Sequence, residues 1–523
     1  MTGAPLSTTR TPRICSADEA VADIADGATI GVSGSGGGIL EADAILAAIE
    51  RRFLETGHPH GITVVHGFGI GDRSTTGLNR LRHPGLLARV IGAHWTWAPG
   101  LVELAMNNEI EAYSFPAGVI NQLMRETGAR RPGLTTRVGL GTYVDPRQAG
   151  GRMNDKATEE FVTLVEIDGT EYLHYQPIPL DAAIIRGSQL DQRGGISQRH
   201  EAAYLDSFAL ALAAQGSGGM TLAQVKEAAP ERLRPQQVQI PGPLVDRVVI
   251  EPEQQQTYAG EYLDSLAGGP YDATIKPDLP ADPARQIIAR RAAMEVEEDV
   301  ILNLGFGISA HVTDVLAIDG RLDTVTTIIE QGHYGGVLAS GDYFGMSHQS
   351  EALISSTDQF DVFASGRIDI SALGMAQADR AGNVNVSRVG GRIMGPGGFI
   401  DISANAARIV YCGTFTAKGL RVSRRDGKLV IDSEGQIPKF VEEVEEITYS
   451  GPTAYADGRT ALYVTERAVF ELGPDGLVLT EIAPGIDLQR DVLDQMGFQP
   501  VIGDLKEMPA SLFAEDTTSE GEA

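Results

Sequence analysis

The same order of elements occurs twice along the chain, and this repetition is the strongest constraint on the fold. In the first half an apolar strand at 28–33 runs into the glycine loop 34–38, and an amphipathic helix follows. In the second half a strand at 300–304 runs into Gly-Phe-Gly at 305–307, and again a helix follows. Strands that alternate with helices are typical of α/β domains with a parallel sheet. The repeated order predicts an α/β fold with two related halves.

Helix-start signals and a second pair of matching segments agree with this division. Ser16 and Glu19 have the spacing of a capping box, and Asp282 stands as N-cap before a proline and an apolar-periodic segment. The segments 187–198 and 374–387 each follow an apolar strand and carry Asp and Gly in a short polar loop. Each half is therefore expected to repeat more than one strand-to-loop unit.

The length of 523 residues is too great for one compact core, so more than one domain is expected. We predict an N-terminal domain over 14–250 and a C-terminal domain over 282–510. Residues 251–281, rich in Gln, Gly, Pro and Asp, are predicted to form a linker or crossover. The acidic, polar end of the chain, 511–523, is predicted to be a disordered tail.

Charge and cysteine content narrow the class of protein. A net charge of -28 argues against binding nucleic acid or an anionic membrane, because both reward clustered Lys and Arg. The two cysteines, Cys15 and Cys412, are too few for a disulfide framework or a Cys-rich metal site. His58 and His60 are two residues apart, and the histidines lack the spacing of a metal site, so no metal is expected. The chain has no apolar run of membrane-spanning length, and we predict a cytoplasmic protein.

The glycine loops have two interpretations. The loop 34–38 does not match the dinucleotide fingerprint G-x-G-x-x-G, because Ile39 stands where the last glycine is needed, and it lacks the G-K-[ST] ending of a P-loop. It can be a tight strand-to-helix turn. Alternatively, its amides can face an anion or a developing oxyanion, as can those at 305–307 and 395–398.

Glu330 is the carboxylate whose position most favours a functional role. The β-branched segment TVTTII before it predicts a buried parallel strand, and ligands bind at the carboxyl ends of such strands. Gly332, Gly335 and Gly336 follow and are expected to leave room for a ligand around the carboxylate. A solvated carboxylate at a strand end is the alternative.

The segment EQGHYGG matches the signature E-x-G-x-x-G-G, and in this feature the chain resembles the family I CoA-transferases. The blocks GLGTYVDPRQAGGRMN, AQADRAGNVNVS, GPGGFIDIS and IAPGIDLQRDVLDQMGF also look like blocks of that family, in the same order. The likeness covers residues 14 to 505 and is greatest for the single-chain acyl-CoA:carboxylate group, such as the propionate and acetate CoA-transferases. It implies two tandem, related α/β domains with the active site at their interface.

The resemblance also implies a reaction and a set of site residues. Coenzyme A would pass from an acyl-CoA to a small carboxylic acid, a short-chain or 3-oxo acid, through a glutamyl-CoA thioester on Glu330. CoA is then a substrate, no cofactor or metal is needed, and a homo-oligomer acting in short-chain fatty acid or ketone body metabolism is expected. The predicted oxyanion and CoA-binding residues are Gly397, Gly398, Gly335, Gly336 and Asn383. The predicted substrate pocket consists of Gly36, Gly37, Gly305, Gly307, His333, Tyr334 and Ala117.

The chain departs from the family pattern at the substrate positions. Ala117 stands where the family has a glutamine, and His333 with Tyr334 is bulkier and more polar than the pair common in the signature. These changes predict an acid other than acetate or propionate, or an altered reaction. Two alternatives stay open at this point: an acyl-CoA hydrolase on the same scaffold with His333 as the base, and a nucleotide-binding oxidoreductase, which the missing glycine fingerprint disfavours.

Overall fold

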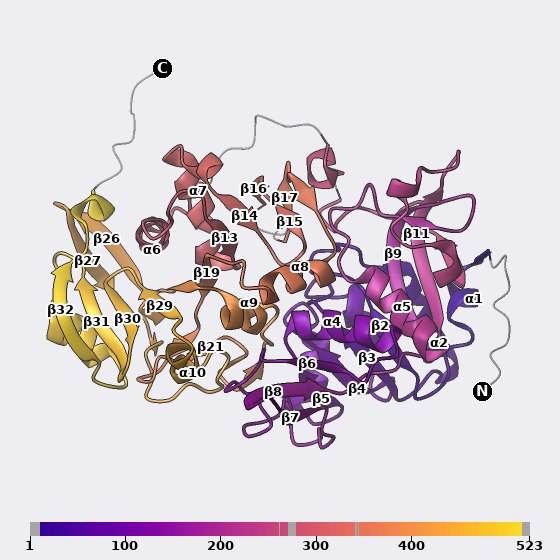
Figure 1. Ribbon diagram of the computed structural model, residues 1–523, viewed down its shortest axis with the longest axis horizontal. Helices are drawn as coiled ribbons and strands as arrows, with labels where there is room; N and C mark the ends of the chain where they lie inside the picture. Colours follow the sequence, from indigo (N-terminus) through magenta and orange to yellow (C-terminus); the bar gives the residue numbers. More distant parts are fainter. Residues whose placement is uncertain (1–10, 261, 270–278, 340–342, 344, 515–523) are drawn as a thin grey trace. The chain divides into compact units, whose positions relative to one another are not determined.

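The computed structural model describes residues 11–260, 262–269, 279–339, 343 and 345–514, and it divides into two compact units (Figure 1). The described residues of Met1–Asp272, Ile329–Ala364 and Arg392–Asp401 form the first unit. Those of Ala273–Ile328, Ser365–Gly391 and Ile402–Ala523 form the second. Each unit is mixed α/β, as predicted.

The units are not continuous in sequence. Ile329–Ala364 and Arg392–Asp401 fall inside the segment 282–510 that we assigned to a C-terminal domain, but they group with the first unit. Glu330 therefore belongs to the first unit. The end of the chain also differs from expectation, because Ala510–Phe513 forms a 3₁₀ helix in which Phe513 is buried. The rest of the predicted tail, 515–523, and part of the predicted linker, 270–278, lie outside the described residues.

The first unit is built on a parallel sheet of eight strands in the order β1-β12-β11-β9-β2-β3-β4-β5, and the short strand β10 pairs antiparallel with β9. The strands are β1 Arg13–Ile14, β2 Thr29–Val32, β3 Ile62–His66, β4 Leu87–Gly92, β5 Glu111–Ser114, β9 Ala182–Leu190, β10 Ile196–Ser197, β11 Met220–Ala228 and β12 Arg247–Ile250. All nine residues of β9 are buried, as expected for a central parallel strand covered on both faces. A separate antiparallel sheet joins β6 Leu134–Thr136, β8 Thr170–Tyr175 and β7 Val162–Ile167.

Helices cover this sheet. They are α1 Ala17–Val21, α2 Asp43–Thr56, α3 Pro99–Met106, α4 Ala117–Gly128, α5 Ser207–Ser217 and α8 Ser356–Ala364. Helix α4 packs against α5 and α8. The predicted capping box of Ser16 and Glu19 is confirmed at the start of α1. Two antiparallel strand pairs also belong to this unit: β15 His333–Tyr334 with β18 Ala352–Leu353, and β16 Val337–Leu338 with β17 Ser347–His348; β23 is Arg392–Ile393.

The second unit has a mixed sheet in which β14, β13, β19, β24 and β29 are parallel neighbours. Strand β30 pairs antiparallel with β29 and β31, and β32 pairs parallel with β31; these last strands lie side by side in yellow in Figure 1. The strands are β13 Ile301–Leu304, β14 Thr326–Ile328, β19 Ile370–Gly374, β24 Arg408–Cys412, β29 Thr460–Val464, β30 Ala468–Gly473, β31 Gly476–Ile482 and β32 Val501–Glu507. The helices are α6 Pro283–Ala293, α7 Val312–Ile318 and α10 Gly451–Ala456, while α9 Phe399–Asn405 begins in the first unit.

The smaller strands of this unit form antiparallel pairs. They are β20 Gln377–Ala378 with β21 Val384–Asn385, β25 Thr416–Ala417 with β28 Ile437–Pro438, and β26 Arg421–Arg425 with β27 Lys428–Ser433; β22 is Arg388–Val389. The predicted N-cap of α6 is confirmed, because the Asp282 side chain accepts a hydrogen bond from the N–H of Ala284.

The two sheets repeat the same neighbour order. Strands β11-β9-β2-β3 of the first unit and β24-β19-β13-β14 of the second are all parallel, and the strand before each glycine loop (β2, β13) lies between the same two counterparts. This agreement supports the two related halves that the sequence predicts. Strand β14, which precedes Glu330, corresponds to β3 of the first unit.

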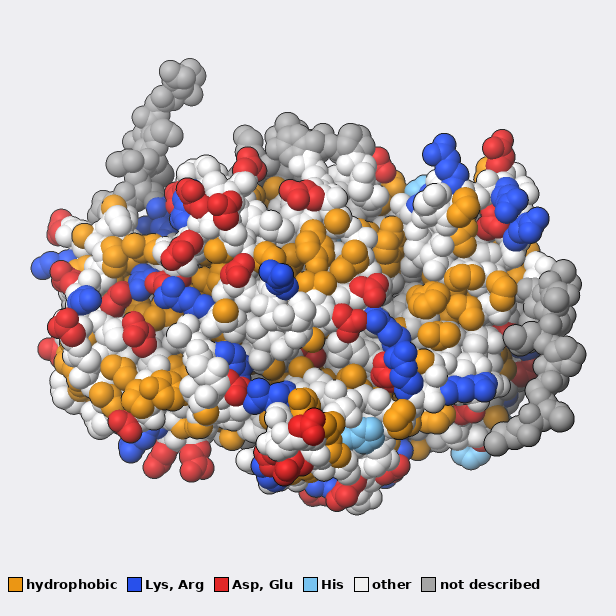
Figure 2. All heavy atoms as spheres, in the orientation of Figure 1, with side chains coloured by type: hydrophobic (Ala, Val, Ile, Leu, Met, Phe, Trp, Pro, Cys, Tyr) orange, Lys and Arg blue, Asp and Glu red, His pale blue; other side chains and the backbone are white. Residues whose placement is uncertain are grey.

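Charged side chains of both signs are visible on the surface (Figure 2). On the face visible in Figure 2, Lys and Arg side chains are interspersed with Asp and Glu rather than gathered into one basic patch. No helix within the described part of the chain has the length and apolar character needed to cross a bilayer.

A buried ion pair fixes the glycine loop of the first unit. Arg186 in β9 and Glu201 are each 3% exposed, and their side chains lie 3.0 Å apart. The guanidinium also donates to the carbonyls of Gly38 and Glu41, at 3.0 and 3.2 Å. The Arg186 side chain therefore ties the central strand to the turn that follows β2. Removing one partner of a buried, hydrogen-bonded ion pair strongly destabilises a fold, because the other charge stays buried without compensation.

We expect Arg186→Met to lower the free energy of unfolding of the first unit by about 3–5 kcal/mol, because it leaves the Glu201 carboxylate buried without its cation. Denaturant unfolding followed by tryptophan fluorescence measures this directly, since both tryptophans, Trp95 and Trp97, belong to this unit.

The matched control is Arg51→Met, which breaks an exposed pair with Asp18 and should cost under about 1 kcal/mol. Equal losses in the two variants would contradict a special role for the buried pair. The double variant Arg186→Met/Glu201→Met should be more stable than Arg186→Met alone.

Candidate active site

Glu330 lies two residues beyond the carboxyl end of β14, where the sequence predicts it. Strand β14 pairs parallel with β13, and the chain turns directly after it, with the N–H of Gly332 donating to the carbonyl of Ile329 at 3.0 Å. The carboxyl ends of parallel strands are where α/β proteins bind ligands. The local fold thus presents Glu330 at a position suited to chemistry.

The surroundings of the Glu330 carboxyl favour its neutral form. Burial among protein atoms raises its pKa to about 7, while hydrogen bonds from the backbone N–H of Gly398 and from Gln331 act in the opposite direction. The Gln331 amide lies 3.3 Å from Oε1. The side chain is half-buried, so it is desolvated yet still reachable. A carboxylate that has lost its water is a better nucleophile than one in bulk solvent.

The turn at Gly397 and Gly398 provides one backbone donor at this carboxyl. The N–H of Gly397 is already bonded to the carbonyl of Ala93 at 2.9 Å, and the Gly397 carbonyl accepts from Ala117 at 2.9 Å. The N–H of Gly398 is the one that meets Glu330. A Cβ at Gly398 would lie 2.0 Å from Oε2 of Glu330, so a larger residue there would displace the carboxyl. Of the two predicted glycines, the geometry therefore assigns the donor to Gly398.

Asp401 is a second carboxyl beside Glu330 that the sequence reasoning did not single out. It is 4% exposed, and it accepts a hydrogen bond from the N–H of Gly118, at the start of α4, at 2.9 Å. Burial raises its pKa well above the ordinary range, and the charge of Glu330 adds to the rise. Asp401 thus anchors the chain three residues after Gly398 to the first turn of α4. Its signal in the sequence was its place in GPGGFIDIS, where it is the one acidic residue.

An aromatic wall adjoins the same turn. The His94 ring lies 3.9 Å from where a Cβ of Gly397 would be, and burial lowers the pKa of His94 to about 4, so the ring is neutral at physiological pH. The Trp97 indole fills the space over Gly36, where a Cβ would come within 2.0 Å of it. On this indole lies the Arg73 guanidinium, 3.9 Å from the ring centroid. Trp97 thus packs on the glycine loop.

The glycine loop 34–38 is closed by its own hydrogen bonds. The N–H of Gly37 donates to the carbonyl of Gly71 at 3.2 Å, and that of Gly38 donates to Glu41 at 3.3 Å. Glu41 is buried, which raises its pKa to about 8. The amides of Gly37 and Gly38 are therefore engaged within the protein, which favours the strand-to-helix turn over the anion site. The predicted pocket roles of Gly36 and Gly37 stay predictions.

The signature residues after Glu330 pack against the segment 347–354. A Cβ at Gly336 would lie 2.2 Å from the carbonyl of His348, and one at Gly335 would lie 2.8 Å from the Glu351 side chain. Both glycines also have φ near +70°, at 65° and 77°. Neighbouring atoms, rather than the open space that we expected around the carboxylate, occupy the room that these glycines leave. Their predicted part in CoA binding stays a prediction.

His333 and Tyr334 form the short strand β15. The His333 ring is 1% exposed, its Nδ1 lies 2.7 Å from the Ser350 hydroxyl, and burial lowers its pKa to about 4. Tyr334 is half-buried. Ala117 is fully buried as the first residue of α4 and brings only a methyl group to a position beside the Gly397 turn.

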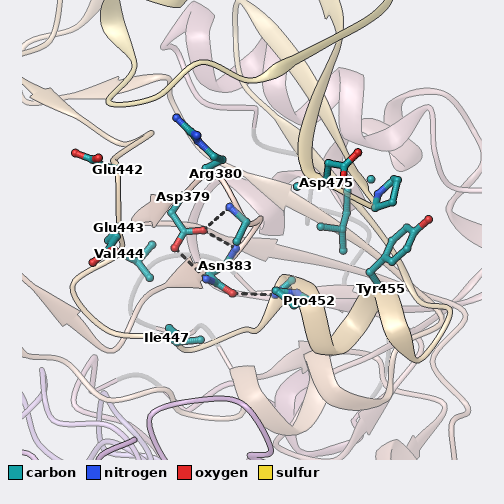
Figure 3. A pocket seen from close by; sticks show the side chains of 16 residues that line it. Asp379, Arg380, Asn383, Glu442, Glu443, Val444, Ile447, Pro452, Tyr455 and Asp475 are labelled. Atoms are coloured by element: carbon teal, nitrogen blue, oxygen red, sulfur yellow. Dashed lines mark hydrogen bonds between the residues drawn. The ribbon is translucent and has the colours of Figure 1, made fainter.

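The remaining predicted residues lie in the second unit. Gly305 donates to the carbonyl of Ala372 at 2.8 Å, and Gly307 has open space where a Cβ would point. Asn383 lines a pocket of about 750 Å³ in that unit (Figure 3). Its amide donates to Asp379 at 3.0 Å, and its carbonyl oxygen accepts from the N–H of Gly451, the first residue of α10, at 3.1 Å.

The pocket in Figure 3 is acidic. Its charged lining residues are Asp379, Arg380, Glu442, Glu443 and Asp475. Four carboxylates against one guanidinium disfavour the polyphosphate of CoA. The hydrogen bonds of Asn383 are accounted for by the turn and the helix cap, so its predicted role in CoA binding stays a prediction.

The elevated pKa of Glu330 has a consequence for stability. Because its folded-state pKa of about 7 is above the ordinary value, the neutral buried form stabilises the fold below pH 4.5, and this contribution is lost as the pH rises through 7. Glu330→Gln should remove this pH-dependent loss. Between pH 4.5 and 8 the free energy of unfolding of the variant should therefore rise relative to that of the wild type, by up to about 3 kcal/mol. Unfolding curves at several pH values, read by tryptophan fluorescence, test this. A pH-independent difference would contradict the desolvated carboxyl.

Known proteins that resemble this chain are CoA-transferases. Residues 14–251 match the Coenzyme A transferase family. The chain is 41% identical to acetate CoA-transferase YdiF of Escherichia coli (strain K12) over 96% of this chain and 95% of that protein. It is 43% identical to caffeate CoA-transferase of Acetobacterium woodii over 96% of this chain and 98% of the relative.

A solved structure is also similar over nearly the whole length. The crystal structure of the acyl-CoA transferase YdiF from E. coli O157:H7, a thioester complex with CoA, has a TM-score of 0.92 at 39% identity and covers 98% of each chain. Identity at this level over both chains exceeds what a shared fold alone would give. The chain therefore belongs to the coenzyme A transferase family and is an enzyme of the CoA-transferase type.

Proposed function

We propose that this enzyme transfers coenzyme A from an acyl-CoA to a free carboxylic acid by a ping-pong mechanism through a glutamyl-CoA thioester on Glu330. The observation that carries the proposal is the desolvated Glu330 carboxyl against the N–H of Gly398. It supports Glu330 as the nucleophile because a carboxylate, weak in water, gains reactivity when it is held dry beside a backbone donor.

The reaction proceeds by exchange at two carbonyl carbons. The ionised Glu330 carboxylate attacks the thioester carbonyl, the carbon–sulfur bond breaks, and CoA leaves as the thiolate, which gives a mixed anhydride. The thiolate then attacks the glutamyl carbonyl, and the acyl group departs as a free carboxylate. A second acid runs the two steps in reverse and leaves as its CoA ester. One thioester is traded for another, so no ATP is consumed.

The Gly398 N–H would stabilise the oxyanion that forms on the glutamyl carbonyl. In enzymes a preorganised donor of this kind contributes about 3–4 kcal/mol to the transition state. The Gly398 amide is preorganised because the turn before it is tied to Ala93 and Ala117 by backbone hydrogen bonds. This arrangement costs nothing to form at the moment of reaction, since the folded chain already holds it.

The acid substrate is proposed to be a short-chain or 3-oxo acid, and the family glutamine is not available to bind it. Ala117 offers no side-chain donor, and Trp97 fills the space over Gly36. Relatives of similar identity are named for acetate and for caffeate, two acids of different size, so overall similarity does not select between them. The residues at the turn and the aromatic wall are the expected determinants.

A hydrolase on the same scaffold is less well supported by the geometry. The base expected for it, His333, is buried, and its pKa is lowered to about 4. Its ring is bonded to Ser350 rather than presented at an accessible surface. Acyl-CoA and a small acid are therefore the partners that we propose, with the homo-oligomer kept as a prediction from the resemblance.

Incubation of the enzyme with acyl-CoA and no acceptor acid should add CoA to the intact protein. Mass spectrometry should find the mass increase of one CoA per chain, on the peptide that contains Glu330. The increase should disappear on addition of an acceptor acid or hydroxylamine, because both attack the glutamyl thioester.

The matched variants are Glu330→Gln, which should carry no label and lose exchange activity, and Glu166→Gln, an exposed glutamate of β7 that should behave as the wild type. A label that persists in Glu330→Gln would refute the proposed nucleophile. Release of CoA at the same rate with and without acceptor acid would instead favour the hydrolase.

Asp401 is proposed as a positioning residue whose role is to accept the hydrogen bond from Gly118. Asp401→Ala should lower kcat by about 100-fold with little change in KM, because the Gly398 donor is no longer held in place. Asp401→Asn keeps an acceptor of the same shape, so its kcat should stay within about tenfold of the wild type. Steady-state exchange kinetics test both. If the two variants lose the same activity, the charge of Asp401 matters instead of its hydrogen bond.

A further inference from the structure

Asp26, His58 and His60 come together in the first unit, at the amino ends of two neighbouring strands of its sheet. Asp26 lies in the turn before β2, and the two histidines lie in the turn before β3, its parallel neighbour. The Nδ1 atoms of His58 and His60 lie 2.9 and 3.0 Å from the same oxygen, Oδ2 of Asp26. Among the described residues, this is the one group of three His, Cys, Asp or Glu side chains whose ligand atoms all lie within 4.8 Å of one another.

We propose that Asp26, His58 and His60 form a binding site for one divalent transition-metal ion, with Zn²⁺ as the best match. Zinc binds imidazole nitrogen and carboxylate oxygen at about 2.0–2.2 Å, which in a tetrahedral site places the ligand atoms roughly 3.4 Å apart. The nitrogen–oxygen separations, 2.9 and 3.0 Å, are about half an ångström shorter than that value. Small side-chain rotations would therefore admit the ion.

The backbone holds the carboxylate ready for this role. The N–H of His60 donates to Oδ1 of Asp26 at 2.9 Å, which fixes the carboxylate; the Nδ1 of His58 lies 3.0 Å from this oxygen as well. The carbonyl of His60 accepts from the N–H of Gly27 at 2.9 Å, so the two turns are tied to each other on both sides of the cluster. Hydrogen bonds that orient ligands in this way are typical of metal sites.

The ligand set selects the kind of ion. Two imidazoles and one carboxylate suit Zn²⁺, Ni²⁺ or Cu²⁺, whereas Mg²⁺ and Ca²⁺ require oxygen ligands. Each neutral imidazole can move its proton from Nδ1 to Nε2, so binding at Nδ1 needs no net change of charge on the rings. All three side chains are exposed, which leaves water to complete the coordination sphere.

The position of the cluster indicates a structural role. The loops of the candidate active site follow the carboxyl ends of the strands, whereas these three residues precede β2 and β3. An ion here would join the α1–β2 turn to the α2–β3 turn and leave the chemistry of Glu330 untouched. The inference therefore stands independently of the proposed transfer reaction.

Equilibrium dialysis of the metal-free full-length enzyme against ZnCl₂, with metal analysis, should find one Zn²⁺ per chain. Co²⁺ in place of Zn²⁺ should give visible absorption bands of nitrogen and oxygen ligation. The variants His58→Gln and His60→Gln should each weaken binding by about 10- to 100-fold or more, and the double variant should abolish it. CoA-transfer activity should be the same with and without the ion.

Two control variants test whether other histidine or cysteine side chains of the protein bind the ion. His311→Gln removes a histidine that pairs with Asp314 alone, at 2.9 Å, and Cys15→Ser removes the half-buried thiol; both variants should bind as the wild type does. Absence of stoichiometric uptake by the wild type overturns the proposal. So does uptake that the double variant retains.

Discussion

The chemistry that we propose depends on the contact between the Glu330 carboxyl and the backbone N–H of Gly398. Burial makes the carboxyl reactive, and the same burial raises its pKa toward neutrality, so the fold must supply a donor to keep an ionised fraction. The donor is the N–H of Gly398. The hydrogen bond from the N–H of Gly397 to the carbonyl of Ala93 fixes the turn that presents this donor to the carboxyl. Glycine at position 398 leaves the carboxyl in place, because a Cβ there would lie 2.0 Å from Oε2 of Glu330 and displace it. Reactivity and packing are therefore satisfied by one residue.

The rest of the first unit is arranged to hold this contact. The Gly397 turn is bonded to the start of α4 through Ala117, and Asp401 is bonded to the next amide of that helix, at Gly118. Helix α4 packs in turn against α5 and α8, so the turn is braced by the core of the unit. The charge of Glu330 disfavours the ionised form of the buried Asp401 carboxyl and so raises its pKa further. Burying two neighbouring carboxyls costs stability, and such a cost is typical of functional sites.

Much of the fold could be predicted because its signals are local. Local signals depend only on residues that are near each other in the sequence. Examples are the capping box at Ser16, the proline after Asp282 and the β-branched segment before Glu330, and the element that each of them predicts is present. The position of Glu330 at a strand end followed from the same patterns. Unit membership could not be predicted, since Ile329–Ala364 joins the first unit by packing against residues far away in the sequence.

The sequence by itself determined the order of strands and helices, the family resemblance carried by EQGHYGG, and the strand-end position of the carboxylate. Only the tertiary structure decided which amide of the Gly397–Gly398 pair donates to Glu330. It also brought Asp401 to Gly118, which are 283 residues apart, and Asp26 to His58, which are 32 apart. The physical reason is that a hydrogen-bond partner or a ligand set depends on distances set by long-range packing, on which residue spacing along the chain carries no information.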